Sequence, residues 1–339
     1  MSSNQLFHSI LSYAIQAKAS DLHLVSGIAP RIRVQGKIQS ISFPALLPMA
    51  IRDILNKIMP ERIKKQFEKQ CELDFAFTDK IYSHHRFRVS VFRQHYGISA
   101  VFRIIALQVP HLDELKLPES IKEIALLPKG LVLVTGPTGS GKSTTLAAMV
   151  QYRNENRQEH IITIEDPIEF IHSSQKCLIT QREVSQDTAS FNQALFSALR
   201  ADPNVILVGE LRNLETIQLA LTAAETGHLV LAKLHTQSKE KTLHRLIDVF
   251  PGDEKNMVRV LLADVLEAVI GQKLVNTINN KERVAVIEIL RCTPAIRNLI
   301  RENKITQIIS AIQTGQAHGM QTFEQHLSIL KASFPLGEE

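Results

Sequence analysis

The feature that most constrains the fold is a glycine-rich segment near the middle of the chain. It consists of Gly136, Pro137, Thr138, Gly139, Ser140, Gly141, Lys142 and Ser143, with Thr144 directly after it. The apolar run 131–135 precedes the segment, and apolar residues at helical spacing follow it. A strand that passes through a GxxxxGK[ST] loop into a helix binds phosphate groups, because backbone N–H groups and the positive helix end point at them. The sequence therefore predicts a nucleotide site on an α/β sheet.

Each residue of this segment has an expected part in binding ATP and Mg²⁺. The nine residues 136–144 are expected to surround the nucleotide phosphates. Lys142 is expected to reach the β- and γ-phosphates, and the Ser143 hydroxyl is expected to coordinate Mg²⁺. The alternative, an ordinary glycine-rich turn, explains neither the strand before the segment nor the helix after it.

Acidic residues follow two other predicted strands. Glu210 comes after the branched run 205–208 and Gly209, at the strand end where ligands of open α/β sheets bind. We expect Glu210 to position or deprotonate the attacking water. The second cluster, Glu165, Asp166 and Glu169, follows the run 161–164, and bound Mg²⁺ would offset the repulsion among its carboxylates. Glu165 is its best catalytic and Mg²⁺-binding candidate, and a solvated turn is the alternative.

Two histidines flank the predicted strand 229–234. With Glu225, His228 has the spacing of a metal pair, but no third ligand with suitable spacing is evident. We therefore expect His228 and His235 to sense or orient the γ-phosphate and its water. A structural role is the alternative for either one.

The first part of the chain carries a strand with alternating arginines. In the segment 86–91, the period of two places Arg86 and Arg88 on one face and the apolar residues on the other. Arg103 stands on the partner strand. Exposed guanidinium groups on a rigid strand suit bidentate recognition of phosphate, whereas a solvated face with ordinary ion pairs is the alternative.

The periodicity of the chain changes near residue 110. Before it, we expect an α+β domain with a helix near the start and a charged helix at 50–69. We expect its strands at 22–25, 31–34, 37–41, 86–92 and 98–105. Pro110, Pro118 and Pro128 then mark a linker. Beyond it, buried strands alternate with helices as in a parallel sheet, at 131–134, 161–164, 205–208 and 229–234. From about residue 253 to the end we expect almost only helices.

Composition excludes several classes of protein. Of 339 residues, 44% are hydrophobic and 22% are charged, which is typical of a globular chain. A net charge of +5 is small for a nucleic-acid-binding protein, and we expect no nucleic-acid partner. The three cysteines, Cys71, Cys177 and Cys292, are too far apart for a metal pair and fit a reducing cytoplasm. No apolar run is long enough to span a membrane.

Together these motifs resemble the PilT-type pilus-retraction ATPases of the secretion-ATPase superfamily. The resemblance runs over nearly the whole chain. Besides the phosphate loop, it includes an N-terminal segment (19–24 with 31–36), an acidic box (164–170) and an acid-bearing strand (199–212). It also includes a histidine box (221–236) and a C-terminal signature (295–302). The last of these resembles the signature of the retraction branch, and the scattered cysteines lack the four-cysteine zinc site of the extension branch.

The resemblance implies a fold, an assembly and a cellular role. It implies a PAS-like α+β domain at 1–108, a linker at 109–118, a RecA-like core at 119–270 and a mainly helical region at 271–339. It further implies a cytoplasmic homohexameric motor that drives pilus retraction at the inner face of the inner membrane, with an integral platform protein and paralogous pilus ATPases as partners. In such a ring, Arg86, Arg88 and Arg103 would be presented to a neighbour's nucleotide and would act there as catalytic residues.

Three residues depart from the family pattern. Asn213 replaces the usual Asp, Lys233 replaces a small or hydroxylated residue, and Tyr96 replaces a basic one. Lys233 would place an ammonium group one residue before Leu234 and His235. None of the three changes affects Lys142, Ser143, Glu165 or Glu210, and we therefore expect an active ATPase that turns over more slowly than its relatives. A secretion or assembly ATPase of the same superfamily and a weakly active regulatory paralogue are the alternative functions.

Overall fold

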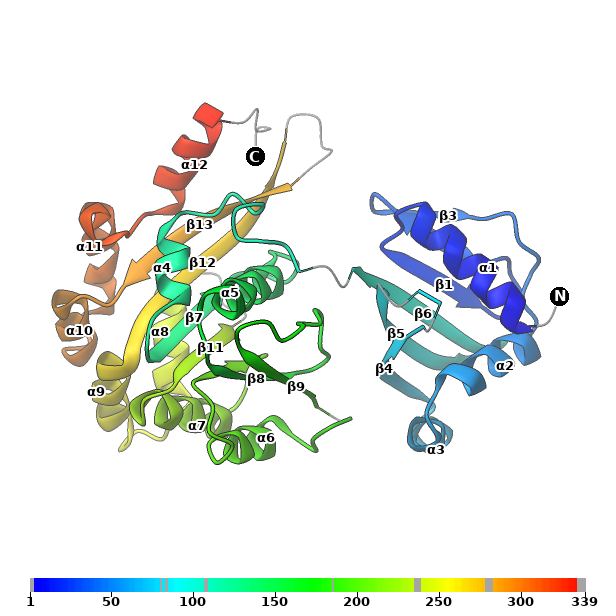
Figure 1. The fold of residues 1–339 in the computed structure, drawn as a ribbon, viewed down its shortest axis with the longest axis horizontal. Coiled ribbons are helices and arrows are strands. Elements are labelled where there is room, and N and C mark those ends of the chain that lie inside the picture. Colours follow the sequence, from blue (N-terminus) through cyan, green and yellow to red (C-terminus); the bar gives the residue numbers. More distant parts are fainter. Residues whose placement is uncertain are drawn as a thin grey trace. The chain divides into compact units, whose positions relative to one another are not determined.

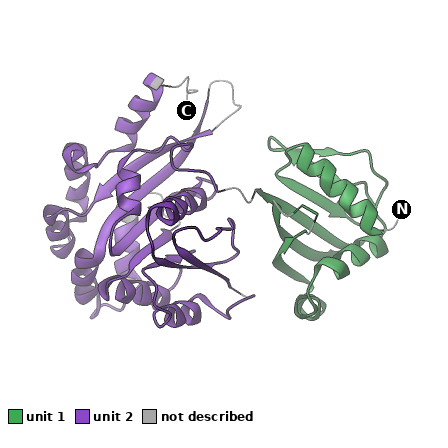
Figure 2. Cartoon of the chain, in the orientation of Figure 1, with its two compact units in different colours: residues 1–108 green, residues 109–339 purple. Residues whose placement is uncertain are grey.

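The computed structural model describes residues 3–79, 81–82, 85–106, 109–184, 186–234, 239–277 and 283–333. The chain forms two compact units, residues 1–108 and residues 109–339 (Figure 2).

The first unit is an antiparallel sheet with helices packed on one face (Figure 1). Its helices are α1 (Ser3–Gln16), α2 (Pro48–Ile58) and α3 (Glu61–Gln70). Its strands are β1 (Asp21–Val25), β2 (Arg31–Val34), β3 (Lys37–Ser40), β4 (Glu72–Thr78), β5 (His85–Gln94) and β6 (Gly97–Ala106), in the order β3-β2-β1-β6-β5-β4. Apolar residues of the helices, such as Phe7 and Ile51, are buried against Phe87 and Phe102 of the sheet. The other face of the sheet therefore carries the polar side chains.

The charged helix expected at 50–69 is two helices. Pro60 separates α2 from α3, and Met59 before it is extended, with φ −82° and ψ 128°. A residue that precedes proline is sterically disfavoured in the helical region, so the helix ends there. Strand β4, which follows α3, was not expected.

The second unit contains a seven-stranded sheet. Its strands are β7 (Gly130–Thr135), β8 (His160–Glu165), β9 (Leu178–Glu183), β10 (Val205–Val208), β11 (Leu229–Leu234), β12 (Leu266–Asn276) and β13 (Arg283–Arg291). The order is β13-β12-β7-β11-β10-β8-β9, and only β13 pairs antiparallel to its neighbour. The carboxyl ends of the six parallel strands therefore meet at one edge.

Helices cover both faces of this sheet (Figure 1). The helices are α4 (Ser120–Ala125), α5 (Lys142–Asn156), α6 (Phe191–Ala198), α7 (Leu214–Glu225), α8 (Lys239–Asp248), α9 (Lys255–Val265), α10 (Pro294–Arg301), α11 (Ile308–Thr314) and α12 (Phe323–Ser333), with 3₁₀ turns at Ile305–Gln307 and Gln316–His318. Val132 and Val134 of β7 face α4 and α5, whereas Leu131 and Leu133 face α6 to α9. This alternation gives the α/β class that the sequence predicts.

Two expectations for this unit are wrong. The chain from residue 253 on is not almost only helical, because β12 and β13 add a long antiparallel pair to the sheet. The region 271–339 is therefore a strand pair followed by helices. The segment 109–118 is also more than a linker, since Leu112 is buried in the core beside α4.

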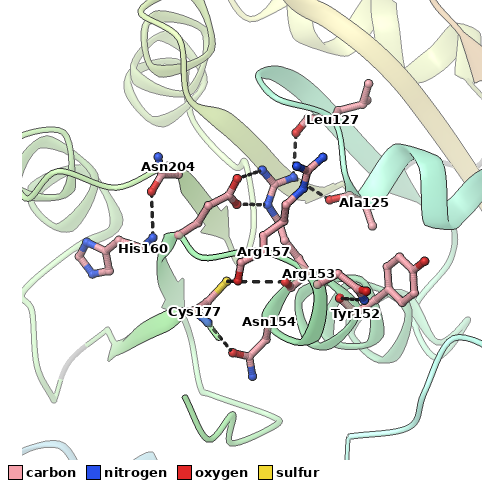
Figure 3. Close-up of polar contacts among 11 residues, drawn as sticks. Ala125, Leu127, Tyr152, Arg153, Asn154, Arg157, His160, Cys177 and Asn204 are labelled. Atoms are coloured by element: carbon pink, nitrogen blue, oxygen red, sulfur yellow. Dashed lines mark hydrogen bonds and ion pairs between the residues drawn. The ribbon is translucent and has the colours of Figure 1, made fainter. Parts of the chain in front are cut away.

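Side chains at the carboxyl end of α5 fix this helix to the rest of the unit (Figure 3). Arg153 is 1% exposed. It pairs with Glu159 at 2.5 and 2.8 Å and donates to the carbonyl oxygens of Ala125 and Leu127 at 2.8 and 2.7 Å. Asn154 accepts the backbone N–H of Cys177 and donates to Ser173. The buried Arg153 and Asn154 therefore direct these hydrogen bonds to groups of the chain itself.

Candidate nucleotide site

The glycine-rich loop connects β7 to α5 in the conformation that the motif requires. Gly136, Gly139 and Gly141 have φ values of +147°, +79° and +86°. A Cβ atom on Gly136 would lie 2.2 Å from the carbonyl oxygen of Gln272. Only glycine fits at position 136, because β12 passes directly beside the loop.

Lys142 begins α5 and points back into the loop. It is 5% exposed, and its Nζ donates to the carbonyl oxygens of Gly136 and Pro137 at 2.9 and 2.7 Å. Burial, and next the neighbouring ammonium of Lys233, lower the pKa of Lys142 to about 8. Both loop partners are neutral, so a phosphate that replaces them would gain a charge-assisted hydrogen bond.

Gln272 of β12 holds the loop to the helix. Its Oε1 accepts the Thr145 hydroxyl at 2.7 Å, and its Nε2 donates to the carbonyl oxygen of Ser140 at 2.7 Å. Gln272 is 3% exposed. Sequence reasoning missed this residue because it lies within a segment that was expected to be helical.

The acidic residues lie at the carboxyl ends of β8 and β10, as predicted. Glu165 ends β8, and its Oε1 accepts the Thr163 hydroxyl at 2.8 Å. Burial raises the pKa of Glu165, although the Thr163 hydrogen bond opposes this shift. A Cβ atom on Gly209 would lie 2.9 Å from the carbonyl oxygen of Ile164 and 3.1 Å from Glu165 Cα. The glycine thus allows the two strand ends to approach each other.

Glu210 follows Gly209 at the same edge of the sheet. Its side chain is 13% exposed, and its Oε2 accepts the Nε of Arg212 at 2.8 Å. Asn213, one of the departures from the family pattern, caps α7 by accepting the backbone N–H of Thr216 at 2.9 Å. Asn and Asp are equally good N-caps, so this substitution keeps the helix start intact.

Lys233 lies on β11, the strand between β7 and β10. The register of the strands places it at the same height along the sheet as Glu165 of β8. Its Nζ donates to the Ser143 hydroxyl at 3.2 Å and lies 3.7 Å from Glu169 Oε1. The sequence predicts an ammonium group near the site, and the structure places it on the hydroxyl expected for Mg²⁺.

The two histidines have different outcomes. His228 precedes β11 and therefore lies at the opposite end of that strand from Lys233 and the loop. Its Nδ1 contacts the carbonyl oxygen of Ala223 at 2.9 Å and the Thr226 hydroxyl at 3.2 Å, at the end of α7. The expectation that His228 senses the γ-phosphate is therefore wrong for the phosphate loop of its own subunit. The length of strand β11 lies between His228 and that loop. His235 lies outside the described residues.

The predicted arginines lie on the polar face of the first unit's sheet. Arg88 stands directly opposite Arg103 in the β5–β6 ladder, and Phe87 and Val89 are fully buried on the other face. Arg88 pairs with Asp74 at 2.9 Å, and Arg103 pairs with the buried Asp21 at 3.0 Å. The alternation of Arg86 and Arg88 predicted this face, and the structure adds carboxylate partners for Arg88 and Arg103.

A cavity of about 620 Å³ lies beside the phosphate loop. Thr144, Thr145 and Gln272 line its inner side, and the segment 114–117 and the strand residues Leu274 and Val284 complete it. Its volume is that of a small-molecule site, and its mixture of apolar and polar walls suits a nucleoside. The segment 109–118 therefore contributes to the site.

The oxygen atoms at the loop are of the kind that Mg²⁺ binds. Ser143 supplies a hydroxyl, and Glu165 and Glu210 supply carboxylates. Among the described residues, no group of three histidine, cysteine, aspartate or glutamate side chains could hold a metal ion.

The family model described as type II/IV secretion system protein matches residues 2–332. The chain belongs to this family. It is 52% identical over 330 residues to the type IV pilus retraction ATPase PilT of Pseudomonas aeruginosa, covering 97% of this chain and 95% of that one. It is 42% identical over 321 residues to the type IV pilus ATPase PilU of the same organism, covering 95% and 84%.

A solved structure has the same fold as this family member. The crystal structure of the pilus retraction motor PilT with bound ADP superposes with a TM-score of 0.90 at 42% identity, covering 97% of this chain and 94% of that one. The resemblance to PilT-type retraction ATPases predicted from the motifs is thus confirmed. Within the described part of the chain, no helix is long and apolar enough to cross a membrane.

Proposed function

We propose that this protein is an ATP-hydrolysing motor that powers retraction of type IV pili. The observation that carries the proposal is the buried Lys142, which donates to neutral loop carbonyls and interacts electrostatically with the carboxylates of Glu210 and Glu169. The high identity to a retraction ATPase over nearly the full length supports the choice of machine.

In the reaction, Lys142 exchanges its loop carbonyls for the terminal phosphates, and Glu210 orients and deprotonates the attacking water. Gly136 to Thr144 enclose the phosphates, and the neighbouring cavity takes the nucleoside. Ser143 and Glu165 carry the oxygen atoms expected to hold Mg²⁺, which would supply neutralisation of charge on the phosphates, but in this structure Lys233 donates to the Ser143 hydroxyl.

The proposal includes a homohexameric ring at the inner face of the inner membrane, docked on an integral platform protein and able to associate with paralogous pilus ATPases. Residues 1–108 would be a PAS-like domain that presents Arg86, Arg88 and Arg103 to the nucleotide of a neighbouring RecA-like domain. Arg88 and Arg103 are paired with aspartates, which is compatible with guanidinium groups that change partners on ring closure.

Deleting the gene tests the cellular role. We expect surface pili to accumulate and twitching motility to disappear, with both restored by the wild-type gene. Unchanged piliation and motility would favour a secretion or assembly ATPase of the same superfamily.

Mixing two inactive variants tests the ring. Rings made only of Lys142→Ala subunits or only of Arg103→Ala subunits should lack turnover. If the arginine acts on a neighbour, about a quarter of the sites in a one-to-one mixture combine an intact Lys142 with an intact Arg103 and regain activity. No recovery in rings that contain both subunits would place Arg103 outside the neighbour's site.

A weakly active regulatory paralogue is the second candidate, because Lys233 lies on the hydroxyl of Ser143. Steady-state phosphate release separates the two candidates. A rate that falls in Glu210→Gln supports the motor, whereas equal rates would support the regulator.

A further inference from the structure

Lys233 is held in a confined position beside the phosphate loop. Its side chain is 17% exposed, and its Nζ lies between the Ser143 hydroxyl at 3.2 Å and Glu169 Oε1 at 3.7 Å. The Glu169 side chain is 39% exposed. The ammonium lies closer to the Ser143 hydroxyl than to this carboxylate, so it stays beside the phosphate loop.

The position of this ammonium is the one that a nucleotide's metal ion needs. A divalent ion coordinated by Ser143 would require a lone pair of the oxygen that accepts the Lys233 N–H, and the two cations would repel each other at close range. Lys233 and Mg²⁺ therefore compete for the same small region.

The space around Lys233 supports the same conclusion. The hollow bounded by Ser143, Glu165, His172, Gly209 and Lys233 has a volume of about 10 Å³. Such a volume holds roughly one water molecule, whereas Mg²⁺ usually keeps several waters. With Lys233 in place, this hollow has no room for a hydrated divalent ion.

Two lysines thus converge on the phosphate loop. Lys142 donates to neutral carbonyls, and Lys233 donates to a neutral hydroxyl and lies 3.7 Å from Glu169 Oε1. Together they provide two positive charges for the terminal phosphates without a metal ion. This arrangement differs from one in which a single lysine and Mg²⁺ share that charge.

We propose that Lys233 is a tethered cation that substitutes for Mg²⁺ in nucleotide binding, so that this chain binds nucleoside triphosphate almost equally well with and without the metal. The inference rests on the nucleotide site of the proposed function. It assigns to Lys233 a direct contact with the phosphates of the ligand.

Calorimetric titration of the full-length protein with the ATP analogue AMP-PNP, in excess Mg²⁺ or in EDTA, tests the proposal. We expect the wild-type affinity to change by less than about threefold when Mg²⁺ is removed. Lys233→Thr, which introduces the hydroxylated type of residue usual in the family, and Lys233→Met, which keeps an unbranched chain without the charge, should each lose at least about tenfold in EDTA. Lys233→Arg should behave as the wild type.

The matched control is Lys129→Thr, because Lys129 is exposed and precedes β7 at the end remote from the loop. It should match the wild type in both buffers. A wild-type loss in EDTA as large as that of Lys233→Thr and Lys233→Met would overturn the proposal. Absence of binding to the wild type in both buffers would overturn the proposed function itself, and the role of Lys233 with it.

Discussion

The two ends of helix α5 satisfy their buried cations in different ways. At the carboxyl end, Arg153 has a carboxylate and two carbonyl partners (Figure 3). Asn154 beside it donates to the carbonyl oxygen of Ser173. At the amino end, Lys142 donates hydrogen bonds to two loop carbonyls, and Lys233 has a hydroxyl and a more distant carboxylate. One end is complete without a ligand, and the other holds positive charge that a ligand can neutralise.

This difference separates stability from function along a single helix. A buried charge with its counter-charge mainly stabilises the fold, because removal of one partner leaves the other unpaired. A buried charge held by neutral groups contributes less to stability and more to anion binding. Changes at the two ends should therefore affect different measurements.

The largest effect is expected from Lys142→Ala. Because its ammonium is the loop cation expected to reach the β- and γ-phosphates, its removal should lower the rate of phosphate release by about a thousandfold. The free energy of unfolding should change by no more than about 1 kcal/mol. Phosphate release and urea unfolding measure the two quantities, and a large loss of stability would contradict the contrast between the ends.

Arg153→Ala should do the reverse. Loss of the guanidinium leaves Glu159 and two carbonyl oxygens without their donor, so the second unit should lose about 3 kcal/mol of stability. Turnover per folded molecule at low temperature should stay near that of the wild type. The matched control is Arg157→Ala, since the Arg157 side chain is exposed, and its unfolding curve should not move.

Gln272→Ala tests the residue that joins the loop to α5. The variant leaves the Thr145 hydroxyl and the Ser140 carbonyl unpaired in a buried place, which should cost about 2 kcal/mol. It should also weaken AMP-PNP binding, because the loop loses its attachment to β12. Thermal unfolding and calorimetry measure both effects, with the exposed Gln218→Ala as the control. If only the thermal stability or only the AMP-PNP affinity fell, Gln272 would not serve both the stability of the loop and its ability to bind nucleotide.

The smallest effect concerns pH. Burial lowers the pKa of His172, beside α5, to about 4, whereas an unfolded histidine has a pKa near 6.5. Between these values the unfolded chain binds the proton better, so stability is present above pH 6.5 and is lost as the pH falls. From pH 7.5 to 5.5 the loss from this group should be about 1 kcal/mol.

Urea unfolding of the wild type and His172→Gln at both pH values measures this contribution. The variant should lose less stability than the wild type over the same interval. His326 has a pKa lowered by burial as well and stays in both proteins, so it does not affect the difference. Equal losses in the two proteins would contradict the assignment to His172.

Much of the site could be predicted because its signals are local. The phosphate loop, the run before Glu210 and the alternation around Arg88 each depend on neighbouring residues alone. Lys233 was also visible as an unusual residue, but its contact with Ser143 depends on the order of the strands and on no sequence pattern. His228 was misplaced for the opposite reason, since nearness in sequence to the strand says nothing about which end of it a side chain occupies.

The strands that were missed needed tertiary information. Helix α9 ends at Val265 and β12 begins at Leu266, with neither glycine nor proline to mark the change. Pairing with β7 determines the strand conformation, and only this pairing brings Gln272 to the loop. The break at Pro60, in contrast, was present in the sequence as a residue disfavoured inside helices.

The hydrogen bonds from Lys142 to its own loop have a consequence for selectivity among ligands. The loop is preorganised by an internal substitute for phosphate, so binding is an exchange of partners in which little new order is created. An incoming group must be a better acceptor than two peptide carbonyls, and a charged phosphate oxygen meets that condition, whereas a neutral hydroxyl or amide does not. These two hydrogen bonds thus set a threshold that excludes neutral ligands before any contact with the base or sugar is made.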